Sequence, residues 1–144
     1  MTEPEPERLE ITIGNASAEI GRISEEIDYF VVRHGLPDKI AFELNLAIDE
    51  ILANIISHGY DDPGPHAIEL RCALADGEIT LEVEDGGRAF NPFDAPPPDL
   101  TASIEDRPIG GLGVHIVRTL MDHVEYRRRD EKNIVILRKK LVAR

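Results

Sequence analysis

Hydrophobic and polar residues alternate along five short segments of this chain. In the first segment, RLEITIG, the residues Leu9, Ile11 and Ile13 share one face. A period of two is typical of a strand with one buried and one solvated face. Asp76 and Gly77 separate two of the segments, and Asp-Gly at such a position indicates a hairpin turn. The predicted strands are residues 8–14, 67–74, 78–85, 124–129 and 133–141.

Three longer segments carry apolar residues every three or four positions, which is the spacing of an amphipathic helix. Ser17 is a suitable cap for the first helix, and Gly35 and Pro37 end it. The apolar stripe of that helix consists of Ile20, Ile23, Ile27, Phe30 and Val31. The predicted helices are residues 17–34, 38–58 and 110–124.

These elements predict an α/β fold, a two-layer sandwich whose mixed, mostly antiparallel sheet is covered on one face by about three helices. A chain of 144 residues has the size of one domain. We expect residues 1–7 to be disordered and residues 8–144 to form this domain. Residues 86–110 have no periodicity and contain five prolines. A loop of that length in a compact domain is usually functional or mobile.

Composition narrows the classes of function. The chain is 42% hydrophobic and 31% charged, an ordinary globular balance. Its formal net charge, 16 − 28 = −12, argues against nucleic-acid binding, which depends on Lys and Arg. The same charge would repel a nucleoside triphosphate unless a cation or backbone dipoles intervened.

Three further features bear on location. Cys72 is the only cysteine, which excludes an internal disulfide and suggests a reducing compartment. No apolar run approaches the length of a membrane span, and the first residues, MTEPEPERLE, are acidic and unlike a signal peptide. We therefore expect a soluble, cytoplasmic protein that does not engage a membrane.

Two places in the sequence hold polar residues that could carry chemistry. Glu50 and Asn54 lie one turn apart in the helix 38–58, away from the centre of its apolar stripe. Alone, they indicate no more than the polar edge of an amphipathic helix. Asp85 ends a strand and is followed by Gly86 and Gly87. Such an Asp can accept a hydrogen bond from an exocyclic amino group beside a glycine that admits a flat ring, although a plain Asp-Gly turn is the alternative.

Glycines also open the third helix, in the sequence IGGLGVHIV. A helix N-terminus exposes unpaired N–H groups and a partial positive charge, so it can bind an anion. A simple helix-entry loop explains these glycines equally well. The order of the features is more specific than any one of them: Glu-x-x-x-Asn on a helix, Asp-x-Gly after a strand, a proline-rich segment, and Gly-x-Gly at a helix start.

In this combination the sequence resembles the GHKL (Bergerat-fold) ATP-binding superfamily. It is most similar to the short branch of bacterial anti-sigma-factor serine/threonine kinases of the RsbW and SpoIIAB type. DEILANIISHGY resembles the N-box of that branch, VEDGGRAFNP its G1 box, and GGLGVHIVRTLMDHVEY its G2 box. The resemblance covers residues 8–142.

The resemblance implies roles for seven residues. Asn54 would bind Mg²⁺ through its side-chain oxygen, as this hard cation prefers, and Glu50 would act as general base. Asp85 would accept a hydrogen bond from the adenine amino group, and Gly87 would let the ring approach. Residues from about 95 to 109 would form the ATP lid. The phosphates would be bound by backbone N–H groups of Gly111, Leu112 and Gly113.

The implied function is that of an ATP- and Mg²⁺-dependent protein serine/threonine kinase acting as an anti-sigma factor. Its substrate would be a small STAS-type anti-sigma-factor antagonist; it would also sequester a sigma factor and form a homodimer. Two alternatives stay open, a non-catalytic nucleotide-binding module that switches partners and the detached catalytic domain of a sensor histidine kinase. The second fits less well, since Glu50 matches the serine-kinase N-box and no phosphoacceptor helix pair precedes the domain.

Some positions depart from the family's pattern. Ile55 stands where the family usually has Ala, which predicts different packing behind the site. Lys132 and Asn133 replace the usual Gly-Thr of the last hairpin. We therefore expect one of the polar contacts that the family commonly makes to its nucleotide to be absent. Cys72 is expected in the core, and residues 127–129, RRR, on an edge or solvated face.

Overall fold

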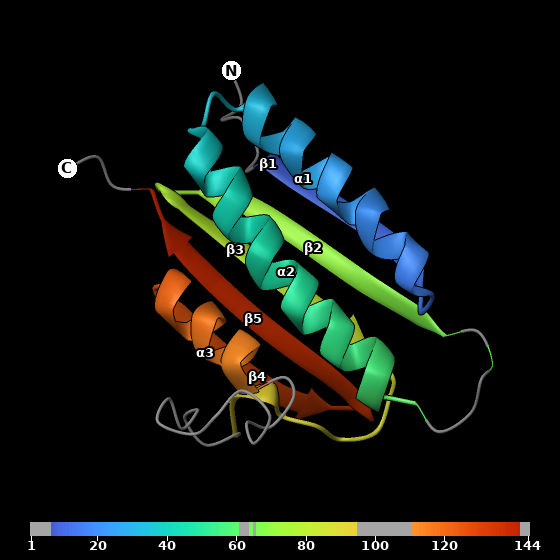
Figure 1. Ribbon diagram of the computed structural model, residues 1–144. Helices are drawn as coiled ribbons and strands as arrows, with labels where there is room; N and C mark the ends of the chain where they lie inside the picture. The colour runs from blue at the N-terminus through green and yellow to red at the C-terminus, as the bar shows by residue number, and fades with distance from the viewer. Residues whose placement is uncertain (1–6, 61–63, 65, 95–110, 142–144) are drawn as a thin grey trace.

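The computed structural model of the chain describes residues 7–60, 64, 66–94 and 111–141. Within these residues, five strands form one sheet in the order β1-β2-β3-β5-β4, and all neighbouring strands are antiparallel (Figure 1). The strands are β1 (Glu7–Gly14), β2 (Ala67–Ala75), β3 (Glu78–Asp85), β4 (His123–Arg129) and β5 (Lys132–Lys140).

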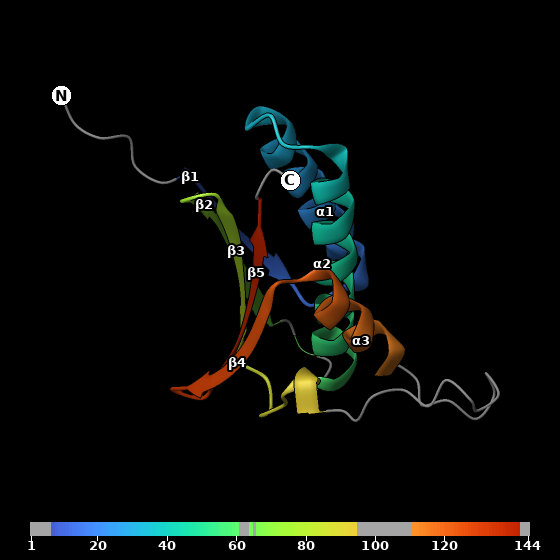
Figure 2. The ribbon, with the colours of Figure 1, turned by 90° about the vertical axis from the view of Figure 1, so that its left-hand side faces the viewer.

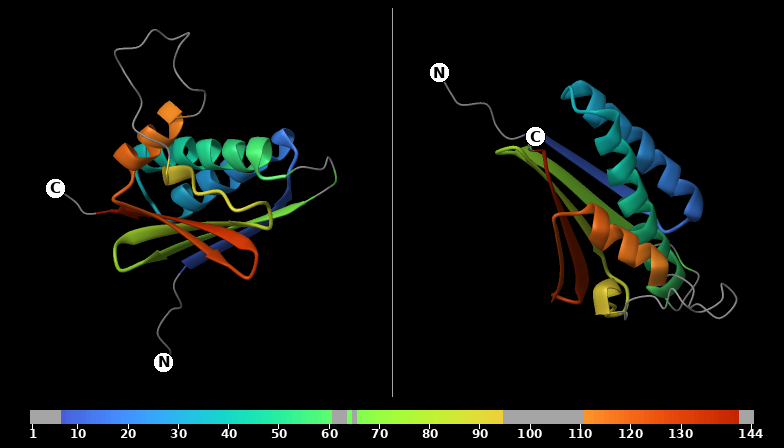
Figure 3. Two further views of the ribbon diagram at one scale, coloured as in Figure 1. Left: turned by 90° about the horizontal axis from the view of Figure 1, so that it is seen from below. Right: turned by 60° about the vertical axis from the view of Figure 1, so that its left-hand side comes forward.

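Among the described residues, three α-helices cover one face of the sheet and none lies on the other face, as Figures 2 and 3 show. α1 (Ile20–Arg33) and α2 (Asp38–His58) run antiparallel, side by side, and α3 (Gly111–Leu120) packs against α2. Two 3-10 turns, η1 (Ser17–Glu19) and η2 (Pro92–Asp94), precede α1 and follow β3. The predicted α/β sandwich is confirmed, with a sheet that is antiparallel throughout the described strands.

The core lies between the two layers because the strands alternate as the sequence predicts. In β3, Ile79, Leu81 and Val83 are fully buried, whereas the residues between them are half-exposed. Cys72 on β2 also faces the core, and burial raises the pKa of its thiol to about 12. The predicted stripe of α1 is confirmed as well, since Ile23, Ile27, Phe30 and Val31 are buried.

Two N-terminal expectations are wrong. Glu7 was expected in a disordered segment, but it is the first residue of β1 and pairs with Leu74. Ser17 was expected to cap the first helix, but it begins η1, and α1 starts three residues later with Glu19 at its N-cap. The chain therefore tightens through a 3-10 turn before the α-helix begins, which is common at helix ends.

The β2–β3 and β4–β5 hairpins both turn through two residues with positive φ. Asp76 has a φ of 53° and Gly77 of 73°, which confirms the predicted Asp-Gly hairpin. Asp130 and Glu131 adopt φ values of 52° and 64° without the freedom of glycine. This second turn joins β4 and β5 in the register in which Asn133 lies opposite Arg128, and on its other side Asn133 lies opposite Asp85 of β3.

Candidate nucleotide-binding site

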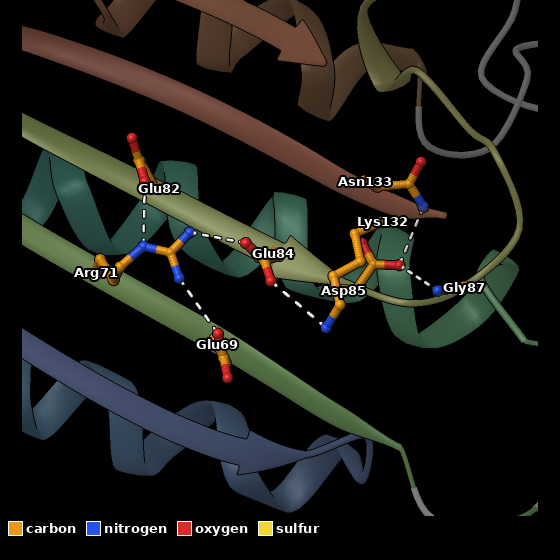
Figure 4. Close-up of polar contacts among 8 residues, drawn as sticks. All are labelled: Glu69, Arg71, Glu82, Glu84, Asp85, Gly87, Lys132 and Asn133. Carbon is orange, nitrogen blue, oxygen red and sulfur yellow. Dashed lines mark hydrogen bonds and ion pairs between the residues drawn. The ribbon is translucent and has the colours of Figure 1, made fainter. Parts of the chain in front are cut away.

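Asp85 is the last residue of β3 and is only 3% exposed. Its Oδ1 atom accepts two hydrogen bonds, from the backbone N–H of Gly87 at 2.8 Å and from Nδ2 of Asn133 at 3.1 Å (Figure 4). Both bonds end on the same oxygen, so Oδ2 is the carboxylate atom with capacity for a further donor. An exocyclic amino group is a donor of that kind.

Asn133 on β5 is a residue whose part in the site the sequence did not reveal. The expectation that one polar contact to a nucleotide is absent stays a prediction, but a polar side chain does occupy this position: Asn133 is 3% exposed, and the hydrogen bonds of its amide all lie at the site. Its Nδ2 donates to Asp85 and, at 2.8 Å, to the carbonyl of Arg88. Its Oδ1 accepts the Tyr126 hydroxyl and, at 3.3 Å, the N–H of Phe90. Asn133 thereby joins β3, β4 and the loop after β3.

The loop after β3 lies directly on the end of α2. A Cβ atom on Gly87 would come within 2.4 Å of the carbonyl oxygen of Gly59, so only glycine fits at this position. Arg88 donates its N–H to the same Gly59 carbonyl at 2.8 Å. Residues 127–129 lie on the exposed edge strand β4, as the sequence predicted. One of them, Arg128, donates a hydrogen bond to the carbonyl of Gly87 at 2.8 Å. The loop is therefore held from both layers.

Glu50 and Asn54 lie one turn apart on α2, as predicted, and contact each other. Nδ2 of Asn54 donates to Oε1 of Glu50 at 3.4 Å, which leaves Oδ1 of Asn54 as its acceptor for other ligands. Burial raises the pKa of Glu50, and the hydrogen bond from Asn54 acts in the opposite direction. A carboxyl group with a raised pKa beside a pocket has the properties of a general base.

The start of α3 packs against Glu50. A Cβ atom on Gly113 would lie 2.1–2.3 Å from the carboxylate atoms of Glu50, so the backbone of the first turn touches that group. Gly111 and Leu112 belong to the same turn, whose N–H groups have no partner within the helix. The structure thus brings the predicted anion site beside the predicted base. The predicted ATP lid, 95–109, lies outside the described residues.

One pocket lies between the end of α2, the end of β3 with the loop that follows it, and β5; its described lining includes neither Glu50 nor a residue of α3. It contains both Asn54 and Asp85, and Ile55, 7% exposed, forms part of its wall where the family usually has Ala. Its free volume is about 10 Å³, room for about one water, so a purine ring does not fit into the pocket as it stands. The pocket is lined by Ile51, Asn54, Ile55, Gly59, Asp85, Arg88, Phe90, Pro92, Asn133 and Val135.

A family model described as the histidine kinase-like ATPase domain matches residues 15–139 of this chain. The chain belongs to this family. Serine/threonine-protein kinase BtrW of Bordetella bronchiseptica is 33% identical over 111 residues, which cover 77% of this chain and 78% of BtrW. Serine-protein kinase RsbW of Halalkalibacterium halodurans is 27% identical over 145 residues, which cover 97% and 86%. An anti-sigma F factor of Clostridium botulinum is 28% identical over 98 residues, 68% of each chain.

These relatives place the chain in the anti-sigma-factor kinase branch of the histidine kinase-like ATPases. Among solved structures, the RsbU and RsbW domains of a Mycobacterium tuberculosis protein match with a TM-score of 0.69 at 18% identity. The match covers 96% of this chain and 33% of that longer chain, and at such identity it concerns the fold alone.

In this member of the histidine kinase-like ATPase family, Tyr60 adds a further polar group near Asp85. Its ring stacks on His66 with centroids 3.9 Å apart. Burial and the nearby Asp85 carboxylate raise the pKa of its hydroxyl to about 12, so Tyr60 is a neutral donor at physiological pH. Its Oη atom is buried, and the adjacent backbone of Gly86 acts in the opposite direction on this pKa.

Among the described residues, no group of three or more His, Cys, Asp and Glu side chains gathers in a way that could hold a metal ion. No helix in that part of the chain is both long and apolar enough to span a membrane.

Proposed function

We propose that the chain is an ATP- and Mg²⁺-dependent protein serine/threonine kinase that acts as an anti-sigma factor. Its substrate is a STAS-type anti-sigma-factor antagonist, and a homodimer sequesters the sigma factor when the antagonist is absent. One observation carries the proposal: Asn54 and Asp85 line one pocket, and Glu50 lies between Asn54 and the start of α3. The kinase names of the relatives support it.

The nucleotide is held at three points. Oδ2 of Asp85 accepts the adenine amino group, because Gly87 and Asn133 already occupy Oδ1. The first turn of α3 presents N–H groups and the positive end of its dipole to the phosphates. Oδ1 of Asn54 is the ligand that fits Mg²⁺, since Nδ2 is directed at Glu50. Bound Mg²⁺ offsets phosphate charge that the −12 chain would otherwise repel.

The residues of the chain position the reacting groups and move one proton. Glu50 accepts the proton of the attacking serine hydroxyl while the new bond from serine oxygen to the γ-phosphorus forms and the bond to the ADP oxygen breaks. The hydrogen bond from Asn54 fixes the direction of the Glu50 carboxylate, and Gly113 allows α3 to approach it. Mispositioning of either group would slow transfer without abolishing nucleotide binding.

The test is incubation with labelled ATP, Mg²⁺ and the purified STAS antagonist. Wild-type chain should transfer label to a serine of the antagonist, and Glu50→Gln should reduce the rate about 10²–10⁴-fold while ADP binding persists. Glu26→Gln, on the exposed side of α1, is the matched control and should have no effect.

The same assay should depend on pH. Because burial raises the pKa of Glu50, the wild-type rate should decline on acidification at a pH above 4.5, the ordinary pKa of a glutamate side chain.

Each other outcome contradicts a stated part of the proposal. Calorimetry that detects no heat with ADP or ATP in the presence of Mg²⁺ would overturn nucleotide binding altogether. Binding without transfer to the antagonist would make the chain a non-catalytic partner-switch module. Label on a histidine would make it a detached histidine kinase domain.

A further inference from the structure

The outer face of the α1–α2 pair carries large apolar side chains in solvent. Tyr29 is 64% exposed, Val32 73%, Phe42 67% and Leu46 38%. These four residues, called here the helix-pair patch, are four of the five large hydrophobic side chains exposed in the described part of the chain. Single exposed hydrophobic residues are ordinary, but a contiguous group of them marks an interaction surface.

The helix-pair patch is contiguous because the register of the two helices is fixed. Nδ2 of Asn45 on α2 donates to Oδ1 of Asp28 on α1 at 2.8 Å, which places these two residues side by side. The helices are antiparallel (Figure 1). Val32 lies one turn beyond Asp28 and Phe42 nearly one turn before Asn45, so both are displaced toward the same end of the pair. Tyr29 and Leu46, the residues next to Asp28 and Asn45, continue the surface at the level of that pair.

The charges around the helix-pair patch are mainly acidic. The exposed bases on the two helices are Arg22, Arg33 and Lys39, and the Arg33 guanidinium carbon lies over the Tyr29 ring, 5.7 Å from its centroid. The exposed acids on the same two helices are Glu25, Glu26, Asp28, Asp38 and Asp49. A second copy of this chain would bring −12 against −12. Complementarity therefore favours a basic occupant over self-association.

We propose that the helix-pair patch is the docking surface for a basic amphipathic helix of a second protein. Two packed helices present ridges of side chains with a groove between them, and a third helix packs into such a groove. Its apolar side chains would cover Val32 and Phe42, and its Lys and Arg residues would face the acidic rim. This recognition mode needs apolar anchors at helical spacing and a charged border, and the patch provides both.

The surface is separate from the nucleotide pocket. Phe42 and Asn54 lie twelve residues apart on the same helix, about 18 Å along its axis. Phe42 and Leu46 of the patch lie in the N-terminal half of α2, and Asn54 and Ile55 of the pocket lie toward its C-terminal end. Failure of the docking proposal would thus leave the proposed kinase intact, and the two can be tested independently.

The test uses a synthetic amphipathic helix of leucine and lysine about 18 residues long, with a scrambled peptide of the same composition as its comparison. The ordered peptide should bind the full chain, and the amide signals that shift in NMR spectra should be those around Tyr29, Val32 and Phe42. Val32→Lys and Phe42→Lys should each weaken binding about tenfold. Thr12→Lys, exposed on β1, adds the same charge elsewhere and should change affinity little.

Since Val32 and Phe42 are exposed, both variants should fold and bind ADP as the wild type does. Equal binding of the scrambled peptide, amide shifts on another surface, or equal weakening by Thr12→Lys would overturn the proposal. So would a wild-type dimer in sedimentation experiments that Phe42→Lys dissociates, because the occupant would then be a second copy of the chain.

Discussion

The Asp85 carboxylate depends on an amide from another strand for its orientation. Asn133 is 48 residues away in sequence, yet its Nδ2 and the Gly87 N–H bond the same carboxylate oxygen. Tyr126 in turn donates to the Asn133 oxygen. A buried network in which every member has a partner fixes one geometry, and losing one member leaves another unsatisfied. Asn133 is accordingly a positioning residue for the proposed adenine contact.

Asn133→Ala should weaken ADP binding about tenfold, because it removes a donor to a buried carboxylate and frees Asp85 to turn. Isothermal titration calorimetry measures this directly. Asn45→Ala is the matched control, since it also removes an Asn donor to an Asp carboxylate, but in an exposed pair between α1 and α2. Unchanged ADP affinity in Asn133→Ala would show that Gly87 alone suffices to orient Asp85.

The residues of the site that the sequence predicted are those with a local pattern. Glu50 and Asn54 show their helical spacing, and Asp85 precedes two glycines, so each could be found without knowing the fold. Asn133 and Arg128 could not, because their partners are set by the register between β3, β5 and β4. That register has no signature in a single sequence beyond the alternation of the strands.

At the scale of elements, α3 is placed by what its first turn touches. Gly113 lies in that turn, and the Glu50 carboxylate occupies the space that a Cβ atom would need. The glycine therefore serves the approach of two helices, in addition to any role with phosphate. A side chain at position 113 would displace Glu50 or push α3 away from α2.

Gly113→Ala should lower phosphotransfer at least tenfold with little change in the melting temperature. The side chain that must yield is the flexible end of Glu50, and alanine favours a helix over glycine by about 1 kcal/mol. Gly21→Ala in α1 is the control, because nothing lies within 4 Å of its added Cβ. Transfer at the wild-type rate in Gly113→Ala would mean that the position of Glu50 does not matter to the chemistry.

The end of α3 is the element boundary that the sequence predicted least well. The apolar periodicity runs on through Met121 and predicted a helix to residue 124, but α3 ends at Leu120. Asp122 donates its N–H to the Arg138 carbonyl at 2.9 Å, and its carboxylate accepts the Lys140 N–H at 2.7 Å. Pairing with β5 thus overrides the helical pattern. The other two helices and the β2–β3 hairpin were predictable because their turn signals are local.

At the scale of the whole molecule, one ion pair joins the helical layer to the sheet near the end of α3. Nζ of Lys139 on β5 lies 3.2 Å from Oε1 of Glu43 on α2, and both side chains are largely buried. One N–H of the ammonium donates to the Leu120 carbonyl at 2.7 Å. Oε1 of Glu43 is buried and accepts no hydrogen bond from the described residues, so its attraction to Lys139 is one of charge. On the open face of the sheet, Arg71 instead pairs with three more exposed carboxylates (Figure 4).

These two clusters should differ in their contribution to stability. Lys139→Met leaves the buried Glu43 charge without its partner and frees the last carbonyl of α3, so it should lower the free energy of unfolding by about 3 kcal/mol. Arg71→Met, the control, breaks pairs in contact with water and should cost about 1 kcal/mol or less. Urea unfolding with a constant m-value measures both.

The double variant Glu43→Gln, Lys139→Met should recover much of the loss, because no buried charge remains. If it were as unstable as Lys139→Met alone, the hydrogen bond to Leu120, and not the ion pair, would hold α3 to the sheet.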